Sequence, residues 1–297
     1  MGKILVIGSA NVDLVIHAPK IPTVGETIVG SDFSVGAGGK GLNQAVAVKK
    51  LGGDVTFMGA LGDDTNGEML KKTLDSYNIN NRCVLVSGKS TGCAMIVVVE
   101  GDNFIVVDEG ANACVTPDMV EGAAELISDA DIVLIQYEIP VESIARIAEL
   151  ASAGGAMLVV NPAPYKELCD GFYSLCDLLV PNEHEAYALT GIYPRSIEDA
   201  MAALDALLEK GVKKAVITLG ANGCVYGDRT QKKYFPAVKT IAVDTTSAGD
   251  SFIGALCVRL SLGADIERAI EYATRAAALT VSRAGASVSI PYASELE

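Results

Sequence analysis

The sequence predicts an α/β protein with a doubly wound, mostly parallel sheet that carries helices on both faces. Short apolar runs alternate with longer amphipathic segments along nearly the whole chain, which is the order of strands and helices in βαβ units. Several of the apolar runs are continuous, as is typical of strands buried on both faces of a parallel sheet. The 297 residues can bury a substantial core, and we expect residues 1–297 to form a single domain.

The elements of this domain can be assigned in chain order. The strand candidates are short apolar runs at Ile4–Gly8, Val55–Ala60, Ile132–Tyr137, Met157–Asn161, Leu178–Pro181 and Ala215–Leu219. The helix candidates between them show helical patterning and lie at Gly67–Tyr77, Met119–Ile127, Glu142–Ala153, Ile197–Lys210 and Ile266–Val281.

Two stretches interrupt the alternation, and neither is followed by a helix of its own. The first contains strand candidates at Val12–His17 and Thr27–Val29. The second, Gly92–Glu109, has the pattern of a hairpin with its turn at Glu100–Asn103. We therefore expect residues 12–33 and 92–109 to form a small β-sheet lid beside the main domain.

The lid is apolar at nearly every position of Ala94–Val99 and Phe104–Val107. Both of its faces should therefore need cover. One face can close over a substrate, and the other would be exposed unless a second copy of the chain covered it. We expect a homodimer joined through the lids.

The composition excludes several classes of partner. Lys and Arg number 23 against 37 Asp and Glu, so the net charge is −14, which disfavours nucleic acid and anionic membranes. Seven cysteines without a C-x-x-C pair, beside only two histidines, argue against a zinc site. Scattered thiols of this kind are typical of the cytoplasm. No apolar stretch approaches the roughly 18 residues of a transmembrane helix, so we expect no membrane span.

The strongest local motif is Val243–Phe252, where small residues and an acid begin a helical run. Free backbone N–H groups and the helix dipole at such a start form an anion site. Asp250 would stand where a base could take a hydroxyl proton beside a bound phosphoryl group. For this segment alone, an acid that merely stabilises the helix is the slightly favoured alternative.

A glycine-rich segment, Gly36–Asn43, opens the next helix. It matches G-x-G-x-x-G but does not close the first βα turn, so it is no dinucleotide site and a dehydrogenase is rejected. It is not a P-loop either, because Gly41 follows Lys40 where Ser or Thr should stand. A structural turn and a loop that offers Lys40 and Asn43 to a hydroxylated ligand are about equally supported.

Two more motifs follow strand candidates. Pro181–Glu185 places carboxylates at the carboxyl end of a strand, where they could face hydrated Mg²⁺ and polyphosphate, or could simply begin a helix. Thr218–Gly223 ends another strand with two glycines. It could be a nucleotide-binding loop, although a hairpin turn is the better-supported alternative.

In combination and in this order, the motifs resemble the ribokinase-like (PfkB-type) family of carbohydrate and nucleoside kinases. The resemblance extends from Ile4 to Pro291 and is carried by Gly8–Asp13, Pro22–Thr27, Gly38–Asn43, Ser90–Gly92, Gly110–Asn112, Asn161–Ala163, Pro181–Glu185 and Asp244–Asp250. It implies the ribokinase-like fold and an ATP-dependent transfer of a phosphoryl group to a sugar.

The resemblance also implies a role for each site residue. Asp250 would be the catalytic base, with the backbone of Ser247, Ala248 and Gly249 as the anion hole. The implied sugar ligands are Asn11, Asp13, Gly39, Lys40, Asn43 and Glu138. Asn182 and Glu185 would organise Mg²⁺ and phosphate, and Thr218, Gly220 and Gly223 would bind ATP. The implied ligands of an activating K⁺ are Asp244, Thr246, Thr280, Arg283, Gly285 and Ser289.

The substrate implied by the resemblance is D-ribose, phosphorylated at its primary (5-) hydroxyl. Asn11 with Asp13 and Asn43 favours a polyhydroxylated sugar over a nucleoside, whose base would ask for an aromatic or apolar platform. The alternatives are a kinase for 2-deoxyribose, fructose or adenosine, and a non-catalytic sugar sensor. A sensor would be expected to have lost Asp250 or the anion hole, and both are present.

Overall fold

A computed structural model of the chain describes residues 2–99, 102–169 and 171–296. Its main sheet has the strand order β13-β12-β11-β10-β9-β8-β1-β4-β5 within these ranges. All neighbours from β11 to β5 are parallel, and β12 and β13 add an antiparallel edge. The strands are β1 (Lys3–Ile7), β4 (Asp54–Gly62), β5 (Asn80–Val86), β8 (Ile132–Gln136), β9 (Met157–Asn161), β10 (Leu178–Leu179), β11 (Lys214–Thr218), β12 (Cys224–Asp228) and β13 (Lys232–Phe235).

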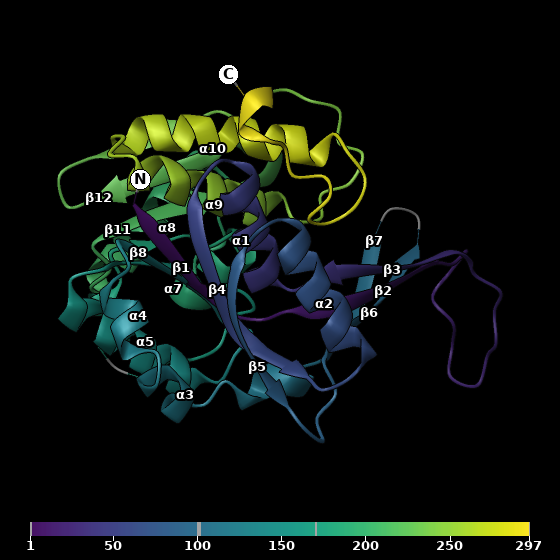
Figure 1. Cartoon of the computed structure of the whole chain (residues 1–297). Helices are drawn as coiled ribbons and strands as arrows, with labels where there is room; N and C mark the ends of the chain where they lie inside the picture. Colours follow the sequence, from purple (N-terminus) through teal and green to yellow (C-terminus); the bar gives the residue numbers. More distant parts are fainter. Residues whose placement is uncertain (1, 100–101, 170, 297) are drawn as a thin grey trace.

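Helices cover both faces of this sheet, as predicted (Figure 1). They are α1 (Lys40–Lys50), α2 (Thr65–Ser76), α3 (Pro117–Glu121), α4 (Ala124–Ser128), α5 (Val141–Gly154), α6 (Phe172–Leu175), α7 (Glu183–Thr190), α8 (Ile197–Glu209), α9 (Ala248–Ser261) and α10 (Ile266–Val281). In β1, Ile4 and Val6 enter the core under α1, α9 and α10, whereas Leu5 and Ile7 enter the core under α5 and α8. This alternation explains why the strand has no polar face.

Some elements differ from the sequence prediction. The segment Met119–Ile127 is not one helix, because α3 ends before Gly122 and α4 begins at Ala124. The edge strands β5 and β13 were not predicted. Both contain several polar residues, since an edge strand is only partly buried.

The lid is a separate sheet of order β3-β2-β6-β7, and a long loop between β2 and β3 extends beyond it (Figure 1). Its strands are β2 (Asn11–His17), β3 (Ser31–Gly38), β6 (Gly92–Val99) and β7 (Asp102–Asp108). The predicted strand at Thr27–Val29 is wrong. That segment lies in the loop with Val29 exposed, and the strand begins at Ser31.

The glycine-rich segment was therefore misassigned in part, because Gly36 and Gly38 belong to β3 rather than to a loop. Of the predicted hairpin turn Glu100–Asn103, residues 100 and 101 lie outside the described residues, and Asp102 and Asn103 belong to β7. No helix within the described ranges is long and apolar enough to cross a membrane.

Candidate active site

A cavity of about 200 Å³ lies at the carboxyl ends of the parallel strands and gathers residues from four predicted motifs. Its lining includes Lys40, Asn182, Glu185, Thr218 and the turn Ser247–Asp250. A second cavity, of about 260 Å³, lies at the opposite ends of β1 and β4 and is lined by none of the predicted site residues. Residues from four separately predicted motifs therefore line one cavity.

The start of α9 forms one wall of this cavity. Ser247, its N-cap, has a left-handed φ of 59° and makes no side-chain capping bond, a strained conformation that is typical of functional sites. Ala248 N–H is bound to the Thr245 carbonyl at 3.2 Å, so it is less free than predicted. The N–H groups of Gly249 and Asp250 have no intrahelical acceptor. The Ser247 hydroxyl is buried, and no described residue bonds to it.

The Asp250 carboxylate is buried beside these N–H groups. Its Oδ1 accepts from Gln44 Nε2 at 3.0 Å, and its Oδ2 accepts from Asn43 Nδ2 at 3.3 Å. Burial raises the pKa of Asp250, while Lys40 and the two amide donors favour the charged form. The two oxygens thus have different environments, and Oδ2 is the more weakly held.

Lys40, the first residue of α1, is the cation of the site. Burial opposes its charge, yet the carboxylates of Asp250, Glu138 and Glu185 together raise its pKa. The ammonium therefore stays charged among three carboxylates. Such a charge can bind a phosphate group that enters the cavity.

The predicted sugar ligands come from the lid strand β2, from the start of α1 and from the segment after β8. Burial, with the charges of Glu138 and Asp250, raises the pKa of Asp13 to about 7. A Cβ on Gly38 would lie 2.0 Å from Asp13 Oδ2, so any larger residue there would have to displace this carboxylate. Asn43 Oδ1 is buried and unpaired among the described residues, so it can accept a hydrogen bond from a ligand hydroxyl.

Two of these ligands are held by residues that the sequence analysis did not select. Glu138 Oε2 accepts from the Ser9 hydroxyl and from Lys40 N–H, so it also caps α1. Asn11 Oδ1 accepts from Asn112 Nδ2 at 2.7 Å. The only sequence signal for Ser9 and Asn112 was that both stand inside motifs that carry the family resemblance.

Gly39 joins β3 to α1 with a φ of 87°. A Cβ at this position would lie 2.8 Å from Asn11 N. Glycine is therefore required for the sharp entry that brings Lys40 and Asn43 into the site.

The motif Pro181–Glu185 begins a helix, which was one of its two predicted alternatives. Asn182 and Glu185 form a reciprocal capping box at the start of α7, with Asn182 N–H donating to Glu185 Oε2 at 2.8 Å. Both residues also line the cavity, and burial raises the pKa of Glu185 while Lys40 opposes the rise. A carboxylate and an amide oxygen beside this cavity fit hydrated Mg²⁺.

The motif Thr218–Gly223 is a tight turn between β11 and β12, closed by a bond of 2.8 Å from Leu219 N–H to the Gly223 carbonyl. Thr218 lines the cavity, whereas Gly220 and Gly223 lie outside its lining. A Cβ on Gly223 would lie 2.1 Å from the Phe235 carbonyl. The glycine is thus explained by the turn itself.

The predicted cation ligands fall into two sets. The first is Asp244, Thr246 and Gly285, and the second is Thr280, Arg283 and Ser289. Asp244 accepts from the N–H groups of Thr246 and Gly285, each at 2.9 Å. Burial opposes its charge, but these donors hold its pKa below the usual range. Within the described ranges no group of three or more His, Cys, Asp or Glu could hold a metal ion. A cation here would therefore depend on Asp244 and on backbone carbonyls.

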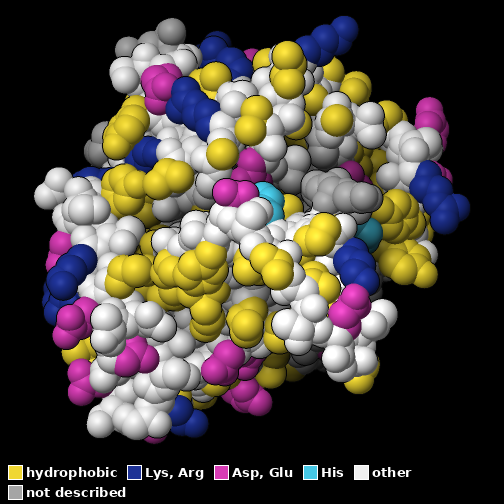
Figure 2. All heavy atoms as spheres, turned by 90° about the vertical axis from the view of Figure 1, so that its right-hand side faces the viewer, with side chains coloured by type: hydrophobic (Ala, Val, Ile, Leu, Met, Phe, Trp, Pro, Cys, Tyr) yellow, Lys and Arg dark blue, Asp and Glu magenta, His cyan; other side chains and the backbone are white. Residues whose placement is uncertain are grey.

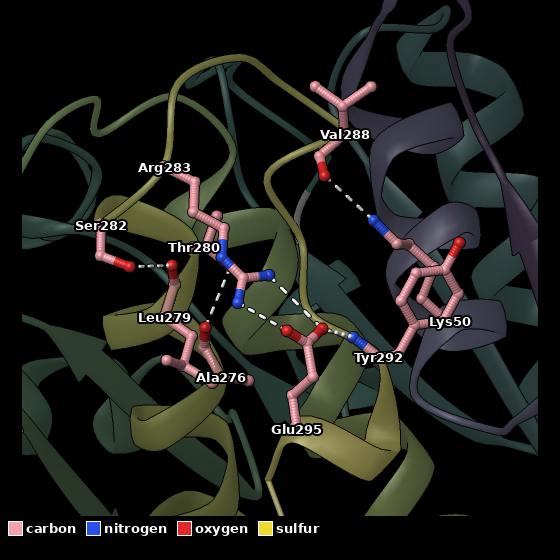
Figure 3. A network of polar contacts seen from close by, with 9 residues as sticks. All are labelled: Lys50, Ala276, Leu279, Thr280, Ser282, Arg283, Val288, Tyr292 and Glu295. Carbon is pink, nitrogen blue, oxygen red and sulfur yellow. Dashed lines mark hydrogen bonds and ion pairs between the residues drawn. The ribbon is translucent and has the colours of Figure 1, made fainter.

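The side chains of the second set are bonded elsewhere. The Thr280 hydroxyl donates to the Ala276 carbonyl, and Arg283 pairs with Glu295 (Figure 3). The Ser289 hydroxyl donates to the Ala286 carbonyl at 2.7 Å. These three positions could offer only backbone oxygen to an ion.

Lys50 holds the loop that contains Gly285. This lysine, the last residue of α1, is only 7% exposed. Its Nζ donates to the Ser287 carbonyl at 3.2 Å and lies 4.8 Å from the centre of the Tyr292 ring. It also donates to the Val288 carbonyl at 3.1 Å (Figure 3). No sequence signal marked it, because a lysine at a helix end is usually solvated.

Comparison with known proteins gives one family. A family model described as "pfkB family carbohydrate kinase" matches residues 1–293. A ribokinase of Schizosaccharomyces pombe is 41% identical over all of this chain and 97% of its own length, and one of Bacillus subtilis is 38% identical over 100% and 99%. The structure of Arabidopsis thaliana ribokinase complexed with ribose and ATP matches with a TM-score of 0.93 at 30% identity, over 99% of this chain and 97% of that one.

Proposed function

This chain belongs to the PfkB family of carbohydrate kinases and is an ATP-dependent sugar kinase, and on that premise we propose that it phosphorylates D-ribose at the 5-hydroxyl. The observation that carries the proposal is the position of Asp250. Its buried carboxylate is bonded to Asn43 on the sugar side, and it shares a cavity with Lys40 and the open N–H groups of α9.

These residues divide the work of phosphoryl transfer, whose loose transition state depends on positioning and on charge stabilisation. Asp250 Oδ2 orients the attacking hydroxyl and receives its proton. The N–H groups of Gly249 and Asp250, with Lys40, stabilise charge on the transferred group. The Ser247 hydroxyl, which has no partner in the described part of the chain, can donate to a phosphate oxygen.

The polar side chains of the sugar site favour a polyhydroxylated substrate. Asn11, Asp13 and Asn43 offer several acceptors in a small buried space. Adenosine would need an apolar or aromatic platform for its base. Fructose and 2-deoxyribose are the closer rivals, because they share most of the hydroxyl groups of ribose.

Two cations fit residues of the site. Asn182 and Glu185 would hold hydrated Mg²⁺ through its water shell, and the metal would neutralise charge on the polyphosphate. We also propose that K⁺ binds near Asp244, whose carboxylate is kept charged by backbone donors. The remaining ligands of K⁺ would be backbone carbonyls.

We propose further that two copies of the chain associate through their lids. Strand register places Val35, Leu14, Met95 and Val106 in one row across the sheet, and Val35, Met95 and Val106 are 50%, 60% and 71% exposed. Figure 2 shows groups of hydrophobic side chains on the side of the molecule that carries the lid. A second lid would remove this row from water.

The dimer is tested by sedimentation over a range of protein concentrations down to nanomolar. Met95→Glu is expected to shift the equilibrium to monomers. Leu262→Glu, an equally drastic change at an exposed leucine outside the lid, is expected to leave the dimer intact. A Met95→Glu protein that stays dimeric at nanomolar concentration would rule out the lid interface.

We place the enzyme in the cytoplasm. The seven cysteines are all free thiols, which is typical of a reducing compartment. Fractionation of the source cells with an antibody against the chain tests this placement.

The function is tested by following ADP release with MgATP and ribose, 2-deoxyribose, fructose, adenosine or no acceptor, each in K⁺ and in Na⁺. Turnover that is fastest with ribose and stimulated by K⁺ is the expected result. Faster turnover with another acceptor would reassign the substrate but keep Asp250 as the base. ATP binding without turnover on any acceptor would favour a sugar sensor.

A further inference from the structure

Three buried amide side chains connect Asp250 to the carboxyl edge of the main sheet. Gln44 in α1 donates from Nε2 to Asp250 Oδ1 and to Asn161 Oδ1, each at 3.0 Å. Gln136, which ends β8, donates from Nε2 to Gln44 Oε1 at 2.6 Å. Asn161, which ends β9, donates from Nδ2 to the Val180 carbonyl at 3.2 Å. Gln44 and Gln136 are completely buried.

The orientation of each amide follows from groups that can only accept. The Val180 carbonyl must receive Asn161 Nδ2, so Asn161 Oδ1 faces Gln44. An ionised Asp250 also only accepts, so Gln44 must present Nε2 to both neighbours. Its Oε1 then faces Gln136, which must donate. The chain of amides has this single arrangement, and it is satisfied while Asp250 Oδ1 is an acceptor.

The arrangement lowers stability at its far end. Gln136 Oε1 is buried and has no partner among the described residues, and burying an unpaired acceptor is unfavourable. A Cβ on Gly8, which follows β1, would lie 1.9 Å from this oxygen, so glycine at this position leaves room for the Gln136 side chain. Local features that lower stability are typical of functional sites rather than of core packing.

We propose that Gln44, held by Gln136 and Asn161, is a positioning residue for the phosphoryl transfer proposed above, on which this inference rests. The amide chain keeps Oδ1 of Asp250 as a permanent acceptor and turns Oδ2 toward the substrate hydroxyl. Among the described residues, only Asn43 donates to Oδ2, at 3.3 Å, so a lone pair remains for the hydroxyl proton. The chain thereby selects which oxygen acts as the base.

Other charges also act on Asp250, so the contribution of Gln44 must be separated from theirs. The charged groups that face Asp250 are Lys40, which favours its ionisation, and Asp13, Glu138 and Glu185, which oppose it. None of them changes when Gln44 is replaced by an apolar residue. Loss of the Gln44 donor removes a bond to the charged form, which raises the pKa of Asp250.

The first experiment is an NMR titration of the ¹³C carboxyl of Asp250 in the full chain, assigned by its loss in Asp250→Asn. Gln44→Met is expected to raise the midpoint by about one pH unit, and Gln136→Met to raise it less. The control Ser143→Ala removes a buried bond of 2.6 Å to the Val115 carbonyl in another part of the fold and leaves the midpoint unchanged. An unchanged midpoint in both methionine variants overturns the proposal.

The second experiment is a double-mutant cycle on the rate of ribose phosphorylation. Gln44→Met is expected to lower kcat about ten- to a hundredfold, with the KM for ribose within about twofold of wild type. Because Gln136 acts through Gln44, the double variant should be no slower than Gln44→Met alone. Losses that multiply would show that Gln136 acts independently and would overturn the chain.

Failure of the proposed function and failure of the positioning role give different experimental results. If the wild-type protein does not phosphorylate ribose, the proposed function is wrong, while the titration still reports whether Gln44 controls Asp250. If the wild type is active and the titration is unaffected by both variants, only the positioning role is wrong.

Discussion

Ribose binding is expected to depend on pH near neutrality through Asp13, whose pKa is raised to about 7 by burial and by its neighbours Glu138 and Asp250. The ionised carboxylate is the better acceptor for sugar hydroxyls. Hydrogen bonds to charged groups contribute about 1.5–3 kcal/mol, against about 0.5–1.5 kcal/mol for neutral ones. A difference of about 1 kcal/mol or slightly more corresponds to a five- to tenfold change in Kd, roughly, since 1.4 kcal/mol is tenfold.

The assay is isothermal titration calorimetry of ribose without nucleotide, from about pH 5.5 to about pH 8.5, a range that brackets the midpoint. Kd is expected to fall as the pH rises through about 7, and binding below that pH should release protons to the buffer. Asp13→Asn should bind weakly and without this pH dependence. Asp250→Asn should keep the dependence but move it to lower pH, because one repelling charge is gone.

A wild-type Kd that stays constant over this range would refute the reasoning, as would a pH dependence that survives in Asp13→Asn. The stability of the free protein gives an independent check. The folded state holds a proton that the unfolded chain releases near the ordinary value of 3.8, so this group's contribution is present below that pH. It is lost as the pH rises toward about 7. In denaturant unfolding, the Asp13→Asn variant should not show this pH-dependent loss of stability.

Three further predictions concern single positions. Asp250→Asn should lower kcat by about 10²–10⁴-fold while calorimetry shows ribose still binding, and a variant that keeps a tenth of the rate, roughly, would exclude a base. Gly38→Ala should raise the KM for ribose about tenfold or more, because its Cβ would lie 2.0 Å from Asp13 Oδ2; an unchanged KM in steady-state assays would contradict the close contact. Lys50→Met should lower the free energy of unfolding by about 1–3 kcal/mol, because the carbonyl of the buried Ser287 and that of the more exposed Val288 both lose their donor. Denaturant titration measures the loss, and a Lys50→Arg variant as unstable as Lys50→Met would argue against it.

Patterned segments were predictable because local sequence determines their burial. The bounds of β9 and α10 match the predicted Met157–Asn161 and Ile266–Val281, since both carry one uninterrupted pattern. The start of β3 was not predictable, because its pairing with β2 overrides a sequence of Ser and Gly that has little strand preference.

The site was predictable where glycines and acids mark a helix start, as at Asp250. It was not predictable where the decisive partner is distant in sequence. Gln44 meets Asp250 across 206 residues and Gln136 across 92. Lys50 meets the Ser287 carbonyl across 237. No local pattern distinguishes such amides and lysines from ordinary polar residues, because only the closed fold brings them to their acceptors.

The strand β2 belongs to both the proposed sugar site and the lid. It begins at Asn11, buried in the site, and ends at the exposed His17 in the lid sheet. Seven paired residues join it to β6 and leave little room for independent bending. We therefore expect sugar binding and the position of the lid to be thermodynamically coupled. A partner that binds one lid position then changes the affinity for the sugar by the same factor by which the sugar changes the affinity for that partner.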